Sequence, residues 1–79
     1  MKYVVVYEKG ENNYGAYVPD LPGCAVVGAT LEEVQTLIVE AVEFHIEGLQ
    51  EAGYPVPLPS NLPVQIDPGM LSTVIEARI

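Results

Sequence analysis

Basic residues are scarce in this chain of 79 residues, which has three Lys and Arg against eleven Asp and Glu and a formal net charge of −8. Such a surface repels the phosphate backbone of nucleic acids over most of its area. Direct nucleic-acid binding is therefore disfavoured, and the natural partner is a basic protein. The alternative interpretation is that the acidity only keeps the protein soluble.

Cysteine and long apolar runs are also scarce. The single cysteine, Cys24, excludes an intramolecular disulfide. No stretch reaches the roughly 18 consecutive apolar residues that a membrane span requires. The N-terminus is interrupted too early for a signal peptide, by Lys2, Glu8, Lys9 and Glu11. We therefore expect a soluble cytoplasmic protein that does not contact a membrane.

The chain does contain enough apolar material for one small domain that spans residues 1–79. Hydrophobic residues make up 49% of it and its mean hydropathy is +0.26, values typical of a sequence that folds. A domain of this size buries only about 60% of the surface that its unfolded chain exposes. A partner would therefore add to its stability.

Valine and tyrosine predict three strands in the first 28 residues. Residues 2–9 and 14–18 form a hairpin, and residues 24–28 return as the third strand. Both faces of the first strand are apolar, which is typical of an interior strand covered on both sides. After the second strand, Pro19 and Pro22 cannot donate to a ladder, and Gly23 can supply the positive φ of a tight turn.

A helix is predicted from Thr30 to about Glu51, because Thr30 and Glu33 have the spacing of a capping box and Gly53 is a C-terminal stop. The residues predicted to face the sheet recur at helical spacing. They are Val34, Leu37, Ile38, Ala41, Phe44 or His45, and Leu49. The opposite face carries Glu33, Glu40, Glu43, Glu47 and Glu51.

The last part of the chain is ambiguous. Four prolines within residues 53–63 predict an extended connector. We favour a final strand at Thr73–Ile79 over one at Val64–Ile66, and the alternative is a short helix over Leu71–Arg78. A final strand beside the first and parallel to it completes an α+β fold, a β-β-β-α-β sandwich of two layers with sheet order 3-2-1-4. One helix covers one sheet face, so we expect the other face to form a homodimer or homotetramer.

Three segments resemble the HicB-like antitoxins of type II toxin-antitoxin systems. They are the Pro-Asp-Leu-Pro-Gly-Cys turn at 19–24, the helix start Gly28-x-Thr30-x-x-Glu33, and Glu43-Phe44-His45-x-Glu47-Gly48-Leu49. The resemblance covers residues 1–60 and leaves 61–79 as a last strand or a short helix. It implies a short form that consists of the N-terminal, degraded ribonuclease-H-like domain.

The resemblance also implies a function. HicB-like proteins bind a small basic mRNA-cleaving toxin of the HicA type and cover its catalytic histidine. Many members carry a C-terminal module that binds DNA, whereas this sequence ends at Ile79 without a helix-turn-helix or ribbon-helix-helix. We therefore expect no direct DNA binding.

Five acidic residues are expected to contact the partner. They are Asp20 and four glutamates of the helix, Glu40, Glu43, Glu47 and Glu51; we call these four glutamates the acidic patch. Carboxylates three or four residues apart repel one another on an isolated helix, and a basic partner relieves that repulsion. The alternative is a merely solvated helix face. Asp20, on a turn stiffened by prolines, either binds a cationic side chain or bonds its own backbone.

We expect no catalytic residue, cofactor or metal site. Ribonuclease H needs carboxylates that converge on metal ions, one of them inside the first strand, where this chain has Val4-Val5-Val6. A residual nuclease that uses Glu8, Asp20 and Glu43 is one alternative function, and a stand-alone oligomer without a toxin is another. His45 and Cys24 lack the neighbours that zinc binding or nucleophilic chemistry requires, and are expected to be packed side chains.

Overall fold

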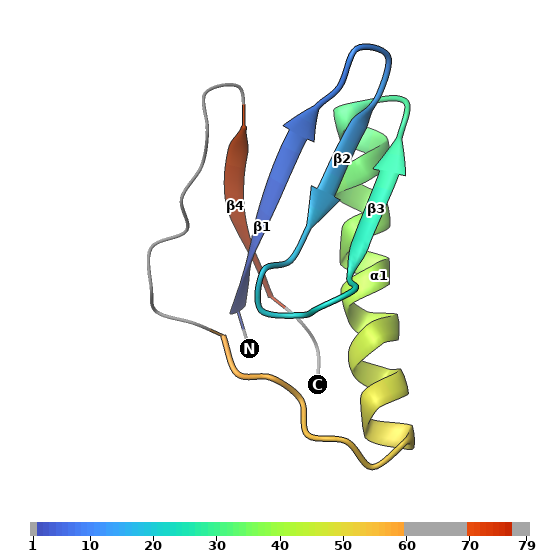
Figure 1. The fold of residues 1–79 in the computed structure, drawn as a ribbon, viewed down its shortest axis with the longest axis vertical. Helices are drawn as coiled ribbons and strands as arrows, with labels where there is room; N and C mark the ends of the chain where they lie inside the picture. The colour runs from blue at the N-terminus through green and yellow to red at the C-terminus, as the bar shows by residue number, and fades with distance from the viewer. Residues whose placement is uncertain (1, 60–69, 77–79) are drawn as a thin grey trace.

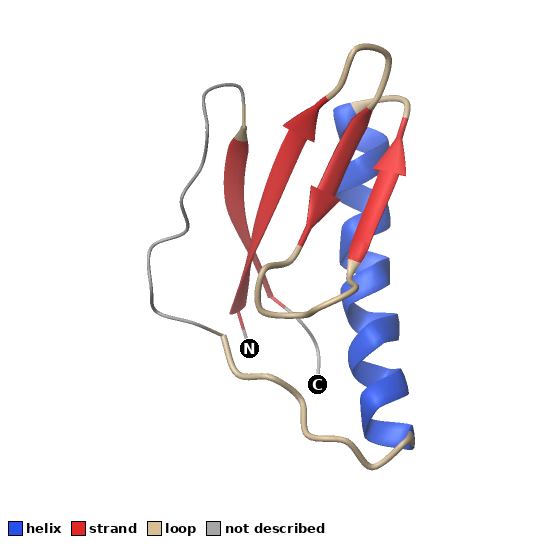
Figure 2. Ribbon diagram, viewed as in Figure 1, coloured by secondary structure: helices blue, strands red, loops and turns tan. Residues whose placement is uncertain are grey.

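The computed structural model describes residues 2–59 and 70–76. Within these residues the order is β1 (Lys2–Lys9), β2 (Tyr14–Tyr17), β3 (Ala25–Gly28), α1 (Leu31–Glu51) and β4 (Leu71–Glu76). The strands form one sheet in the order β3-β2-β1-β4, with α1 against one face (Figures 1 and 2). The predicted α+β fold and its 3-2-1-4 order are therefore confirmed, and β1 is an interior strand.

The core lies between α1 and the sheet. Tyr3, Val5 and Tyr7 of β1 alternate toward it and are buried, as period-two strand geometry requires. The turn between β2 and β3 closes the core at one end, where Leu21 has no exposed surface. Its shape depends on Gly23, whose φ of +84° favours glycine. That prediction for Gly23 is confirmed.

The buried face of α1 differs in part from the predicted one. Its buried residues recur at every fourth position: Val34, Ile38, Val42 and Ile46. Val34 and Ile38 were predicted correctly. Of the two alternatives for the next position, Phe44 is wrong, since 78% of its surface is exposed, whereas His45 is half-buried. Apolar residues occupy much of the circumference of this helix, so two adjacent rows have helical spacing. Packing against β2 and β3 uses the row of branched side chains.

Both predicted helix ends are confirmed. Oγ1 of Thr30 accepts a hydrogen bond from the backbone N–H of Glu33 (3.1 Å). At the other end Gly53 has a φ of +77°, and its N–H donates to the carbonyl of Gln50 (3.1 Å). The N–H of Tyr54 donates to the carbonyl of Leu49 (2.9 Å). This pair of bonds is a Schellman motif, which stops the helix and turns the chain.

Residues 71–76 form a strand, so the alternative of a helix there is wrong, but the strand does not run as predicted. β4 is antiparallel to β1, and pairs Lys2 with Glu76 and Tyr7 with Leu71. The helix ends near the start of β1, whereas β4 begins beside the end of β1 (Figure 1). Residues 52–70 are long enough, at about 3.3 Å each, to connect opposite ends of the sheet. The Val64–Ile66 alternative and the end of the predicted strand at 77–79 lie outside the described residues.

A buried side chain of β1 holds the connector after α1 against the core, beside the partly buried Val56 of the connector itself. The hydroxyl of Tyr3 donates a hydrogen bond to the carbonyl of Pro57 (2.6 Å). Burial, and secondarily the negative charge of Asp20, raise the pKa of Tyr3 above its ordinary value of 10.0. The neutral phenol is therefore the form that the folded protein stabilises.

We predict that Tyr3→Phe lowers the free energy of unfolding by about 1 kcal/mol at neutral pH, because it leaves the Pro57 carbonyl without this donor. Since the folded-state pKa of Tyr3 is raised, its stabilising contribution is complete below pH 10.0 and is lost as the pH rises through the folded-state value. Urea denaturation should show that the difference between wild type and variant shrinks above that pH. A constant difference would contradict the assignment.

Candidate partner-binding surface

The acidic patch lies on the side of α1 that faces away from the sheet. All four of its glutamates are exposed. The last turn of α1 contains no basic residue, and the two lysines of the described residues, Lys2 and Lys9, lie on β1. Glu47 and Glu51 stand at the negative end of the helix macrodipole, where a carboxylate is disfavoured by about 0.3 to 1 kcal/mol. The patch therefore destabilises the isolated domain slightly and suits a cationic partner.

Asp20 lies in different surroundings from the patch. It is half-buried in the turn after β2, and its charge acts on the buried Tyr3 hydroxyl. Its carboxylate therefore lies on the sheet side of the molecule, near the hydroxyl that holds the connector. The structure does not bring Asp20 together with the four glutamates. A contact between Asp20 and a partner stays a prediction.

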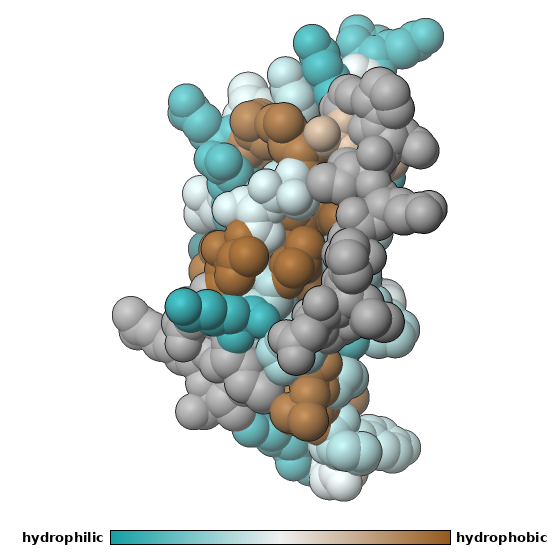
Figure 3. All heavy atoms as spheres, turned by 90° about the vertical axis from the view of Figure 1, so that its left-hand side faces the viewer, coloured by the Kyte–Doolittle hydropathy of each residue, from teal (hydrophilic) through white to brown (hydrophobic). Residues whose placement is uncertain are grey.

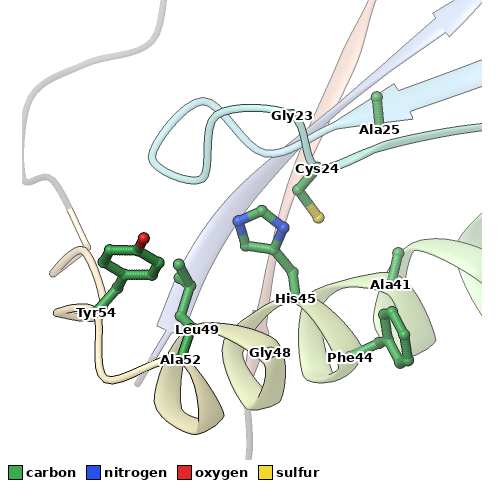
Figure 4. A pocket seen from close by; sticks show the side chains of 10 residues that line it. All are labelled: Gly23, Cys24, Ala25, Ala41, Phe44, His45, Gly48, Leu49, Ala52 and Tyr54. Carbon is green, nitrogen blue, oxygen red and sulfur yellow. The ribbon is translucent and has the colours of Figure 1, made fainter.

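A groove that was not predicted from the sequence lies beside the acidic patch. We call it the Phe44 groove; its volume is about 470 Å³. It runs between the start of β3, the C-terminal half of α1 and the first residues of the connector (Figure 4). It is lined by Gly23, Cys24, Ala25, Ala41, Phe44, His45, Gly48, Leu49, Ala52 and Tyr54. Most of these side chains are apolar or small.

Local structure explains the shape of the groove. The Schellman motif turns the chain so that the Tyr54 ring lies beside Leu49 and forms one end (Figure 4). Gly48 faces the groove with no side chain. Apart from its chain neighbours and the adjoining backbone of α1, no atom lies within 4 Å of the position that a Cβ would take there. In Figure 4 the His45 ring extends from α1 toward the turn at Gly23, and the Cys24 thiol extends from the chain just before β3 toward α1. Burial raises the pKa of that thiol, which makes it a poor nucleophile.

The sequence did contain a signal for this groove. Residues 43–49 resemble a segment of the family, and helical spacing leaves Phe44 and His45 as alternatives for the core-facing row. Phe44 follows Glu43 and precedes Glu47 by three positions, which places it at the border of the acidic face. This position indicated that Phe44 could also lie next to the acidic patch instead of in the core.

The carboxylates required by the nuclease alternative do not converge. Glu8 lies near the end of β1, Asp20 in the turn after β2 and Glu43 on the outer side of α1. Among residues 2–59 and 70–76, no group of three or more His, Cys, Asp or Glu side chains could hold a metal ion.

No helix in the described part of the chain has the length and apolarity to cross a membrane.

Relatives of known sequence match part of the chain. An uncharacterized 14.9 kDa protein of Haemophilus phage HP1 is 45% identical over 51 residues, which are 65% of this chain and 38% of that protein. A UPF0150 protein of Synechocystis is 43% identical over 56 residues, 70% of this chain and 71% of that protein. The chain thus spans well under half the length of the phage protein.

Solved structures match the whole fold. A chain of the HicA3 and HicB3 toxin-antitoxin complex has a TM-score of 0.72 and 27% identity, with both chains covered completely. The N-terminal domain of the Burkholderia pseudomallei antitoxin HicB has a TM-score of 0.75 at 21% identity over both complete chains, a likeness of fold alone.

A family model described as "HicB_like antitoxin of bacterial toxin-antitoxin system" matches residues 3–76. The match contains the helix and every described strand except Lys2, the first residue of β1. This chain therefore belongs to the HicB-like antitoxins of bacterial toxin-antitoxin systems.

Proposed function

We propose that this protein neutralises a small basic mRNA-cleaving toxin of the HicA type by covering the toxin's active site. The observation that carries the proposal is the acidic patch, four exposed glutamates along one side of α1 with no basic residue in the last turn. The likeness to a chain of the HicA3 and HicB3 complex supports it. The chain acts by binding and not by catalysis, in the cytoplasm where mRNA is translated.

Electrostatic complementarity explains how binding of this chain would inhibit mRNA cleavage by the toxin. An enzyme that cleaves mRNA needs cationic side chains around its active site to hold the phosphate backbone. An acidic surface is complementary to those side chains, so the glutamates occupy the place of the phosphates. The net charge of −8 would also accelerate the encounter of the two proteins. The same charge disfavours direct binding of the chain to DNA.

Co-expression tests the proposal. The small basic protein encoded beside this gene should arrest growth when it is expressed alone, because it cleaves mRNA. Expression of this chain together with it should restore growth, and the two proteins should purify as one complex. Undiminished toxicity, or the absence of any small basic protein encoded beside the gene, would count against an antitoxin role and favour a stand-alone oligomer.

We further propose that the chain self-associates through the sheet face that α1 leaves uncovered. The strand register places Val4, Tyr17, Val27 and Val74 on this face. Val27 is 66% exposed and Val74 is 56% exposed. Figure 3, which faces the β4 side of the molecule, shows hydrophobic side chains there in separate groups among more polar ones. Burying such valines contributes about 1.5 kcal/mol or more for each side chain.

The expected species is a homodimer or a homotetramer. Sedimentation equilibrium at micromolar concentration should give a mass at least twice the 8.5 kDa of one chain. Val74→Ser and Val27→Ser should each weaken the assembly, whereas Leu58→Ser, at another exposed apolar site (77%), should not. A monomeric mass for the wild-type chain would contradict self-association.

A further inference from the structure

We propose that the Phe44 groove receives an apolar side chain of the basic partner, held between Lys or Arg residues that pair with the neighbouring glutamates. The inference rests on the proposed function and specifies how the partner is recognised. The volume of the Phe44 groove, about 470 Å³, is within the range of pockets that hold a ligand, about 300 to 1,000 Å³. One large side chain fits there.

Gly48 is the first argument for this role. It lies inside α1, where glycine destabilises a helix more than any residue except proline. Its φ is not positive, in contrast to Gly23 and Gly53, so backbone conformation does not require glycine. Nothing stands where its Cβ would be, so close packing within the domain does not require it either. Glycine at this position leaves the groove open.

The exposed aromatic side chains are the second argument. Phe44 is 78% exposed and Tyr54 is 65% exposed, and both line the groove. Aromatic side chains bury large areas and dominate the energy of many interfaces when they surround a pocket. Phe44 and Tyr54 are exposed to water at opposite parts of one groove. Covering them with an apolar side chain of a partner would remove this apolar surface from water and stabilise the complex.

The charges around the groove identify the chemistry of its occupant. Phe44 lies one helical turn from Glu40 and from Glu47, with Glu43 next to it in sequence. A second copy of this chain, with a net charge of −8, would bring like charges together at this border. An anionic membrane surface would be repelled in the same way. A basic protein segment with a central apolar residue can place that residue in the groove and its Lys or Arg side chains beside the glutamates at the border.

Filling the groove from within tests the proposal. Gly48→Leu adds a good helix former whose side chain projects into the groove, and Phe44→Ala removes a wall without touching the core. Gln35→Leu adds the same side chain at an exposed position of α1 that does not line the groove. The probe is the HicA-type toxin encoded beside this gene, purified with its catalytic histidine replaced by alanine. Calorimetry gives the Kd, and thermal unfolding shows that each variant is folded.

The proposal predicts that Gly48→Leu and Phe44→Ala each weaken binding at least about tenfold, that Gln35→Leu changes it little, and that Gly48→Leu unfolds at a temperature no lower than wild type. Wild-type affinity in both groove variants would overturn the groove as the docking site while leaving toxin binding intact. Failure of the wild-type chain to bind the toxin would overturn both this inference and the proposed function.

Discussion

Neutralising the acidic patch should weaken binding to a HicA-type toxin on the order of 100-fold, mostly through a slower association rate. The variant carries glutamine at Glu40, Glu43, Glu47 and Glu51. Glutamine has nearly the helix propensity of glutamate and a similar shape, so the fold is preserved. Because Glu47 and Glu51 oppose the helix macrodipole, the free variant should be slightly more stable than wild type.

A matched control separates the position of the charges from their number. Glutamine at four other exposed glutamates, Glu8, Glu11, Glu32 and Glu33, changes the net charge of −8 by the same amount. Surface plasmon resonance at several salt concentrations should show a slower association for the patch variant and a smaller dependence on salt. Equal losses in both variants would mean that net charge, and not this surface, governs binding.

The second large effect is on stability. Ile38→Ala should lower the free energy of unfolding by about 2 to 5 kcal/mol, because Ile38 is fully buried in the middle of the row that packs on the sheet. A small domain has only about 5 to 15 kcal/mol in total. We therefore expect a large decrease in the midpoint of urea denaturation, and substantial unfolding near 37 °C.

Phe44→Ala is the control for this prediction, since it removes a larger apolar side chain from the same helix. Because Phe44 is 78% exposed, its loss should change the free energy of unfolding by no more than about 0.5 kcal/mol. Similar destabilisation in the two variants would favour Phe44 as the core-facing alternative to His45 and contradict the structure.

Much of the fold could be predicted because local chemistry determines it. A run of Val and Tyr residues defines β1, Gly23 and the two prolines before it define the turn, and Thr30 and Gly53 define the helix ends. The direction of β4 could not be predicted, because a proline-rich connector fixes neither end of the sheet as its destination. The rotation of α1 was ambiguous. Steps of three residues lead from Ile38 through Ala41 to Phe44, a step of four leads from Ile38 to Val42, and only packing against the sheet selects between the two rows.

The candidate surface was predictable in its charge and not in its shape. The glutamates could be placed on one helix face because period 3.6 relates their positions. The groove depends on the contact between the start of β3 and α1 and on the direction in which the Schellman motif turns Tyr54. Those relations appear only in three dimensions. The sequence signal for the groove was Gly48. A glycine inside a helix could have indicated a position where the absence of a side chain leaves a surface groove open.

The most direct test of the antitoxin role is the cleavage of mRNA by the purified toxin in the presence of this protein. We predict that cleavage stops when the chain is equimolar with the toxin, and that the patch variant requires a large excess. The control variant, altered at Glu8, Glu11, Glu32 and Glu33, should inhibit like wild type. Cleavage that continues unchanged in a large excess of the wild-type chain would contradict the proposed function.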